Sequence, residues 1–254
     1  MKNFLFLGLL VTVPSALGNG LQDSIQLDVH GKIPEKVISS CESNLPPVKV
    51  IVSVKDSPIV ETNDMSVRAL TSAALTSNNP HGNHYVLGLT TIELSWQANA
   101  QYKSYEFSSP NIRCARSEIK IDLAVLYHKV QIANEIAPKS CEYNFVREHE
   151  YRHVKLNQEN IKHYAREIAT EFQDHFQSKI YYGSPDKVEK AVRNEIDKNW
   201  LPFVGRTAKK LEKEGNDRHK LIDTPAEYAK ANVACSGNIA RILKRYYGKP
   251  ETKK

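Results

Sequence analysis

The sequence predicts an α+β protein in which an N-terminal antiparallel sheet is followed by a long helical hairpin. Three observations predict this order: β-branched and alternating segments lie before residue 135, helix-period apolar residues dominate after residue 140, and Pro138 separates the two halves. A hydrophobic content of 41% and a charged content of 25% are ordinary for a globular protein with a core. We expect a single domain over residues 20–254, with its sheet part at about 47–135 and its helical part at about 140–247.

Residues 1–19 have the three parts of a secretory signal peptide. Lys2 forms the basic end, residues 4–13 form an apolar core, and small residues at 15–18 form the cleavage region. The apolar core is too short for a membrane span, and no later segment reaches the roughly 18 apolar residues that a span requires. The sequence therefore predicts a protein exported to the bacterial periplasm or secreted, with no stable membrane insertion after signal cleavage.

The sheet part contains several strand signals in succession. Residues 48–54 and 85–96 are rich in β-branched residues, and residues 101–107 add a shorter candidate. Residues 118–128 begin with a clean alternation, and residues 130–133 either extend that strand or form the next one. Because the run ending near Ala133 comes just before the helical part, we expect it to be the sheet edge beside the functional site.

The helical part begins with a long segment that contains few helix breakers. Ser140 is a suitable N-cap for a helix from Cys141 to about residue 180. Residues 182–186 form a turn, and a second helical segment follows at 186–214, where Pro202 predicts an interruption and Gly215 predicts the end. Thr224 to Glu227 has the pattern of a capping box, which accounts for Glu227 and opens a last helix.

The four cysteines predict two disulfides, because an even number of cysteines is expected to pair in an oxidising compartment. Three pairings are possible. We favour Cys114–Cys141 together with Cys41–Cys235, since the first pair flanks the start of the long helix.

The most informative motif is His149-Glu150-Tyr151-Arg152-His153, an HExxH sequence within that helix. Residues i and i+4 of a helix lie on one face, so His149 and His153 are candidate ligands of one Zn²⁺. Glu150 is then the candidate catalytic residue, as the general base for the attacking water. The motif predicts a zincin-like helix with zinc as the cofactor.

A catalytic zinc also needs a third protein ligand. Glu159 has the sequence spacing for this role, but the chain would have to turn away after His153 and contains no glycine that favours a turn. A returning antiparallel helix would instead bring later residues level with the two histidines. The candidates from this register are Glu212, Glu214, Asp217, His219, Asp223 and Glu227. His219 and Asp223 are the most attractive, and the sequence does not decide between them.

The segment Ile132 to Cys141, followed by the HEYRH helix, resembles a family of exported bacterial proteins. These proteins carry a domain of unknown function and are described as secreted Zn-dependent proteases. The resemblance covers roughly residues 47–180 and, more weakly, residues 223–235. It implies zinc bound by His149 and His153, with Glu150 as the base, and leaves the third ligand and the substrate open.

These observations predict an exported zinc-dependent hydrolase, with a metalloprotease as the first choice and a peptide or protein as its substrate. The charged neighbours Arg147, Arg152 and Lys155 are unusual around a protease motif, so the sequence favours metal binding more strongly than proteolysis. One alternative is a non-catalytic envelope-binding or structural protein with a helical hairpin, and another is a zinc amidase acting on cell-wall peptides. We expect no nucleic-acid partner, because no nucleic-acid-binding module is present.

Overall fold

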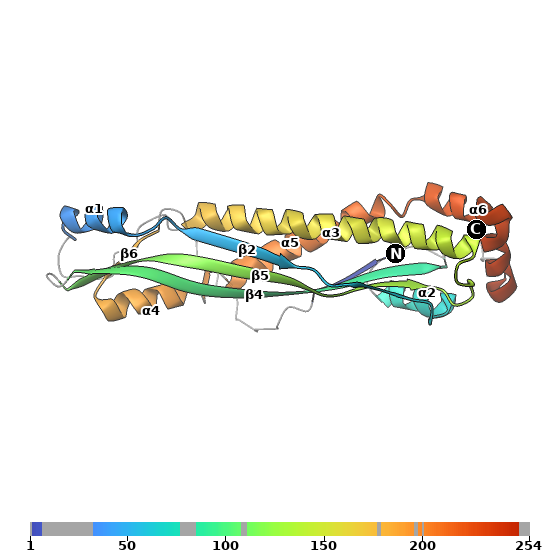
Figure 1. The fold of residues 1–254 in the computed structure, drawn as a ribbon, viewed down its shortest axis with the longest axis horizontal. Coiled ribbons are helices and arrows are strands. Elements are labelled where there is room, and N and C mark those ends of the chain that lie inside the picture. Colours follow the sequence, from blue (N-terminus) through green and yellow to red (C-terminus); the bar gives the residue numbers. More distant parts are fainter. Residues whose placement is uncertain are drawn as a thin grey trace, which may run out of the picture.

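The computed structural model describes residues 2–6, 33–76, 85–107, 111–176, 179–195, 198–199 and 201–248. The molecule is elongated, and a single long helix, α3 (Cys141–Phe176), runs along one face of a mixed sheet (Figure 1). The structure is therefore of mixed α and β type, as the sequence predicts. Apart from residues 2–6, the expected signal peptide lies outside the described residues.

Six strands form one sheet in the described part of the chain. Their bounds are β1 Lys2–Phe6, β2 Lys49–Lys55, β3 Ile59–Thr62, β4 Gly88–Phe107, β5 Ile112–Ile132 and β6 Tyr181–Gly183. β4 and β5 form a long antiparallel hairpin, and β6 is also antiparallel to β5. However, β1 is parallel to β4, and β2 and β3 are parallel to β5. The antiparallel sheet expected from the sequence is thus not confirmed, because three of the five strand pairings are parallel.

The two central strands, β4 and β5, are longer than the strand segments that the sequence predicts. β4 joins the segments expected at 85–96 and 101–107 into one strand, and β5 extends the expected strand at 118–133 back to Ile112. β5 has β4 on one side and β2 or β3 on the other, so its end near Ala133 is not a sheet edge. Beside the HExxH motif, where Thr90 contacts Glu150, β4 is paired with β1 along Thr90–Leu94, so β1 is the outermost strand on that side of the sheet.

Six helices are described, with bounds α1 Glu35–Asn44, α2 Val67–Thr76, α3 Cys141–Phe176, α4 Pro185–Glu195, α5 Leu201–Lys220 and α6 Pro225–Tyr247. α3 begins where the sequence predicts, and Ser140 Oγ accepts a hydrogen bond from the backbone N–H of Tyr143, as an N-cap does. A simple helical hairpin is not confirmed, because β6, α4, α5 and α6 follow α3 as separate elements.

Gly215 does not end a helix, contrary to the expectation from the sequence. α5 continues through it to Lys220. A Cβ at this position would collide with the Tyr164 hydroxyl of α3, so the glycine allows the two helices to approach each other closely. Helix packing, rather than helix termination, therefore explains this glycine.

The expected disulfide pairing is wrong: the bonds are Cys41–Cys114 and Cys141–Cys235. Cys114 lies near the start of β5 and Cys141 follows its end. At about 3.3 Å per residue, the strand between them spans roughly 60 Å, far beyond the reach of a disulfide. The two bonds lie at opposite ends of the elongated molecule (Figure 1). Cys41–Cys114 joins α1 to the start of β5, and Cys141–Cys235 joins the start of α3 to α6.

α3 is held against the sheet by apolar packing along its whole length. Its first half buries Val146 and Val154 against residues from α2, β4 and β5. Its second half buries Ile168 and Phe172 against the β5 residues Ile119 and Ile121, among others. The HExxH motif lies in the first half, so its backbone is fixed by the core on one side. Among the described residues, no helix is long and apolar enough to cross a membrane.

Candidate metal centre

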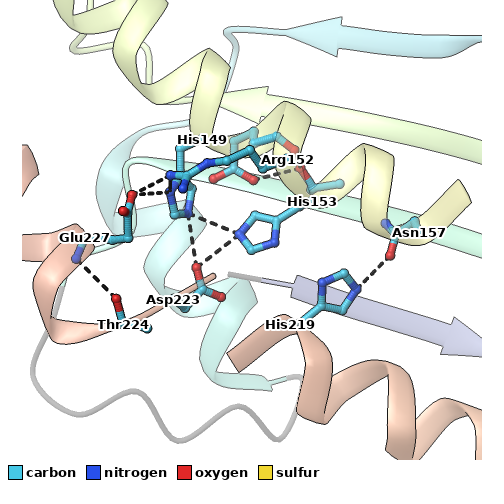
Figure 2. Close-up of polar contacts among 10 residues, drawn as sticks. His149, Arg152, His153, Asn157, His219, Asp223, Thr224 and Glu227 are labelled. Carbon is cyan, nitrogen blue, oxygen red and sulfur yellow. Dashed lines mark hydrogen bonds and ion pairs between the residues drawn. The ribbon is translucent and has the colours of Figure 1, made fainter. Parts of the chain in front are cut away.

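His149, His153 and Asp223 bring three potential ligand atoms together (Figure 2). Asp223 Oδ1 lies 3.1 Å from His149 Nε2 and 3.0 Å from His153 Nε2, and the two Nε2 atoms are 3.1 Å apart. Tetrahedral ligands with bonds of about 2.0–2.2 Å stand roughly 3.3 Å from one another. The three atoms therefore have nearly the mutual spacing that a single metal ion requires.

Two of the three candidate ligands, His153 and Asp223, are buried, and His149 is partly exposed. The side chains of His153 and Asp223 are 0% and 2% exposed, and that of His149 is 18% exposed. Two imidazoles and one carboxylate are a ligand set that metal ions accept in catalytic sites, where the remaining position is available to water or substrate. The donor set and its burial both fit such an ion.

Asp223 is positioned by the short connection between α5 and α6. Its backbone N–H donates to the carbonyl oxygen of His219 at the end of α5, and the next residue, Thr224, caps α6. The Cys141–Cys235 disulfide holds α6 near the start of α3. Two local turns and one covalent bond thus place a carboxylate opposite two histidines that lie about seventy residues earlier in the chain.

Glu150 lies next to the centre with its carboxylate fully enclosed. It is 1% exposed, and the Thr90 hydroxyl donates a hydrogen bond of 2.7 Å to its Oε2 atom. Gly88 of β4 leaves the space that this side chain needs, because a Cβ there would stand 2.7 Å from Glu150 Cγ and Oε1. Glu150 lines the same cleft as His149 and Asp223. Glu150, the predicted general base, therefore shares a cleft with two of the candidate ligands.

His219 lies beside the centre and outside the ligand group. Its Nε2 atom is 2.7 Å from Asn157 Oδ1, and its ring centroid is 5.4 Å from that of His153 (Figure 2). Asn157 Nδ2 in turn lies 3.2 Å from His128 Nε2. Of the two third-ligand candidates, the geometry brings Asp223 to the histidines, and His219 joins a buried polar chain behind His153.

Sequence reasoning did not include Asn157 or His128 among the functional residues. Asn157 could have been found, because it follows His153 by four residues and so lies on the same face of α3. His128 could not have been found in this way, because its contact with Asn157 depends on how β5 packs against α3. Both side chains are buried, with exposures of 1% and 0%. They form a rigid polar support on the inner side of the centre.

Glu227 makes contacts beyond the capping box that the sequence predicts. Thr224 Oγ1 accepts from the Glu227 N–H, but the Thr224 N–H donates to the Ile222 carbonyl, so only half of the box forms. The Glu227 carboxylate instead accepts hydrogen bonds from Arg152 and Lys230, and it lies 3.9 Å from His149 Nδ1. The two cations lower the pKa of Glu227 to about 2. Its carboxylate is thus ionised beside a candidate ligand.

The charged residue Arg147 is directed away from the centre. Its guanidinium donates to Glu61 of β3 and lies 4.3 Å above the Tyr151 ring. The hydroxyls of Tyr143 and Tyr151 also donate to Glu61. Burial alone would raise the pKa of Glu61, but these hydrogen bonds outweigh it and lower the pKa. Arg147 therefore belongs to a cluster around Glu61 and is not among the residues that line the cleft.

Tyr151 and Tyr228 have different surroundings. The Tyr151 hydroxyl donates to Glu61 of β3. Tyr228 of α6 lines the cleft with Glu150 and Asp223. Burial, followed by the negative charges of Asp223 and Glu150, raises the pKa of Tyr228 above its ordinary value. Its hydroxyl therefore keeps its proton at neutral pH and can serve as a donor.

No protein-family model matches this chain, and no curated protein or solved structure matches it either. The resemblance described from the sequence stays a prediction. Any functional assignment therefore depends on the geometry of the centre.

Proposed function

We propose that the protein is an exported zinc-dependent hydrolase that cleaves peptide bonds. The observation that carries this proposal is the cluster of His149, His153 and Asp223, with the buried carboxylate of Glu150 on the same cleft. A base next to a three-ligand site with one open side is the arrangement that metal-assisted hydrolysis requires. The zinc assignment follows from two imidazoles and one carboxylate in an HExxH context.

Each residue has a separate task in this mechanism. His149, His153 and Asp223 would hold the zinc, which supplies Lewis acidity and a water of lowered pKa. Glu150, held by Thr90, takes the proton from the attacking water and passes it to the leaving nitrogen. We assign Tyr228, which lines the cleft, as the donor to the oxygen that becomes negative in the transition state.

A peptide substrate is supported by the β4 edge. Thr90, which binds Glu150, is also the first β4 residue after Gly88 and Leu89 to pair with the N-terminal strand β1. In the structure β1 pairs with Thr90–Leu94 as an extended chain. Because residues 2–6 belong to the predicted signal peptide, its cleavage would free this position for a peptide substrate beside Glu150. Export is supported by the two disulfides, which form in oxidising compartments.

Three variants test the proposal. His153→Ala and Asp223→Ala should lose stoichiometric zinc, measured by metal analysis of dialysed protein, and should also lose peptide hydrolysis. Glu150→Gln should retain zinc and lose hydrolysis by about 10²-fold or more. His163→Ala is a matched control, because His163 lies on the same helix and is 41% exposed, away from the centre. Full activity in Glu150→Gln would refute the mechanism.

The same measurements test the non-catalytic alternative. A purely structural protein would bind no zinc, or would enclose it with four protein ligands. Among the described residues, only three potential ligands come together, which favours an open position. Assays with both a denatured protein and cell-wall peptides would distinguish a protease from an amidase, since these activities share the centre and differ in substrate.

A further inference from the structure

The cleft beside Glu150 combines a polar floor with apolar walls. Its lining includes two of the candidate metal ligands and Glu150 together with apolar side chains. His149, Glu150 and Asp223 lie on one side. The remaining walls come from three elements: Leu87 just before β4, Phe145 and Val146 on α3, and Ala231 on α6. A group bound in this cleft would therefore contact apolar side chains while it lies next to the reacting atoms.

The walls are held in place by contacts outside the cleft. Val146 is 5% exposed and belongs to the main apolar core. Tyr85, which also lines the cleft, packs on Tyr247 with ring centroids 4.9 Å apart. The Cys141–Cys235 bond links the helices that carry Phe145 and Ala231. The cleft is thus preformed, which favours binding of a group that fits it.

The acidic groups of the cleft are already engaged. Asp223 contacts both histidines, Glu150 accepts from Thr90, and Glu227 is bound by Arg152 and Lys230. No lysine or arginine is among the residues that line the cleft within the described chain. An ionised substrate side chain would lose hydration there without gaining a partner, whereas an apolar side chain would be stabilised by burial.

We infer that this cleft is the specificity pocket, and that it selects peptides with a bulky apolar side chain next to the bond that is cleaved. This inference rests on the proposed hydrolase function and names its substrate class. Because the cleft adjoins Glu150, the side chain that enters it belongs to a residue flanking the scissile bond. Leucine-like and phenylalanine-like side chains would contact the apolar walls. An alanine side chain is too small to reach them, and a charged side chain is disfavoured because it would lose hydration.

The first test measures binding without turnover. Zinc-loaded Glu150→Gln protein is titrated by calorimetry with 4-methylpentanohydroxamate, which carries a leucine-like group, and with acetohydroxamate, which does not. We expect the first to bind at least about tenfold more tightly, because each missing methylene in an apolar pocket costs about tenfold or more. Equal affinities would overturn the inference while leaving the zinc site intact.

The second test fills the pocket. Ala231→Phe should remove the preference for the larger hydroxamate, and should shift cleavage of a mixed peptide library from large apolar residues toward alanine. Ala229→Phe is the matched control, because Ala229 is an exposed residue of the same helix outside the cleft. An unchanged preference in Ala231→Phe would also overturn the inference. Failure of the hydrolase proposal itself would be recognised separately, by zinc that persists in His153→Ala.

Discussion

Substituting Gly88 by alanine is a sharp test of how Glu150 is positioned. The added Cβ would stand 2.7 Å from Glu150 Cγ and Oε1 and 2.8 Å from Val146 Cγ1. Ordinary contact begins at 3.4 Å, so the carboxylate must move by about 0.7 Å or more. Val146 is part of the core and α3 is fixed along its length, so Glu150 is the group that yields.

The expected magnitude follows from this displacement. A misplacement near 1 Å in a catalytic group costs about 10²-fold, so we expect kcat for peptide hydrolysis to fall by about that factor. Overpacking at this point should destabilise the protein by about 1–3 kcal/mol. Zinc affinity should be unchanged, because the three atoms nearest to an added Cβ belong to Glu150 and Val146 and none belongs to a candidate metal ligand.

The assay compares kcat, zinc affinity and urea unfolding for Gly88→Ala and for Gly205→Ala. Gly205 lies in α5, where an added Cβ meets nothing within 4 Å, so this control should keep its kcat and gain about 0.5–1 kcal/mol of stability. Unchanged kcat in folded Gly88→Ala protein would refute the proposed role of Glu150. A loss of zinc parallel to the loss of activity would show instead that the metal centre had been disturbed.

Three further predictions concern the surroundings of the centre. Glu227→Gln should weaken zinc binding by about 10-fold or more in a chelator competition, because Glu227 holds Arg152, whose Nη2 atom lies 2.9 Å from His149 Nδ1, and so helps to orient this candidate ligand; unchanged affinity would contradict this role. The pKa of Glu227 is lowered to about 2 from its ordinary 4.5, so its stabilising contribution is present above about pH 4.5 and is lost as the pH falls toward 2. Urea unfolding across that range should show a smaller pH dependence in Glu227→Gln than in the unchanged protein. Removing the disulfide with Cys141→Ala and Cys235→Ala should cost about 2–5 kcal/mol and weaken zinc binding, whereas the bond at the other end of the molecule, removed as a control, should affect only stability.

The local parts of the site could be predicted from the sequence. Ser140 does cap α3, and the spacing of His149 and His153 places both rings at one point, because these features depend only on helix geometry. The exclusion of Glu159 follows in the same way, since α3 continues without a break to Phe176. Features that depend only on one or two turns of a helix could therefore be predicted from the sequence.

The choice between His219 and Asp223 could not be made from the sequence. Both lie within residues 212–227, which an antiparallel returning helix would bring level with His149 and His153. His219 is in the last turn of α5, and Asp223 follows it by four residues. Their roles depend on how the last turn of α5 is rotated, and this rotation follows from the contact of Gly215 with Tyr164 and from that of His219 with Asn157. These contacts join residues 51 and 62 positions apart, which no local pattern records.

The disulfide pairing failed for a related reason. Treating the sheet as several short strands placed Cys114 near Cys141, whereas the single strand β5 carries Cys114 to the far end of the molecule. Exposed Gln97 and Asn99 in the middle of β4 made that strand read as two segments, and the start of β5 before residue 118 was not predicted. Strand length, rather than strand identity, was the property that the pattern did not determine.

The position of Asp223 has a consequence for the order in which the protein is made. It follows His153 by 70 residues, so at about 5–20 residues per second the two imidazoles leave the ribosome roughly 4–14 seconds before the carboxylate. During that interval the chain carries the whole HExxH motif without the complete centre. If the proposed centre binds a metal ion through all three residues, tight binding therefore requires the segment that carries Asp223, and a chain shortened before residue 223 would retain the motif but lack the third candidate ligand.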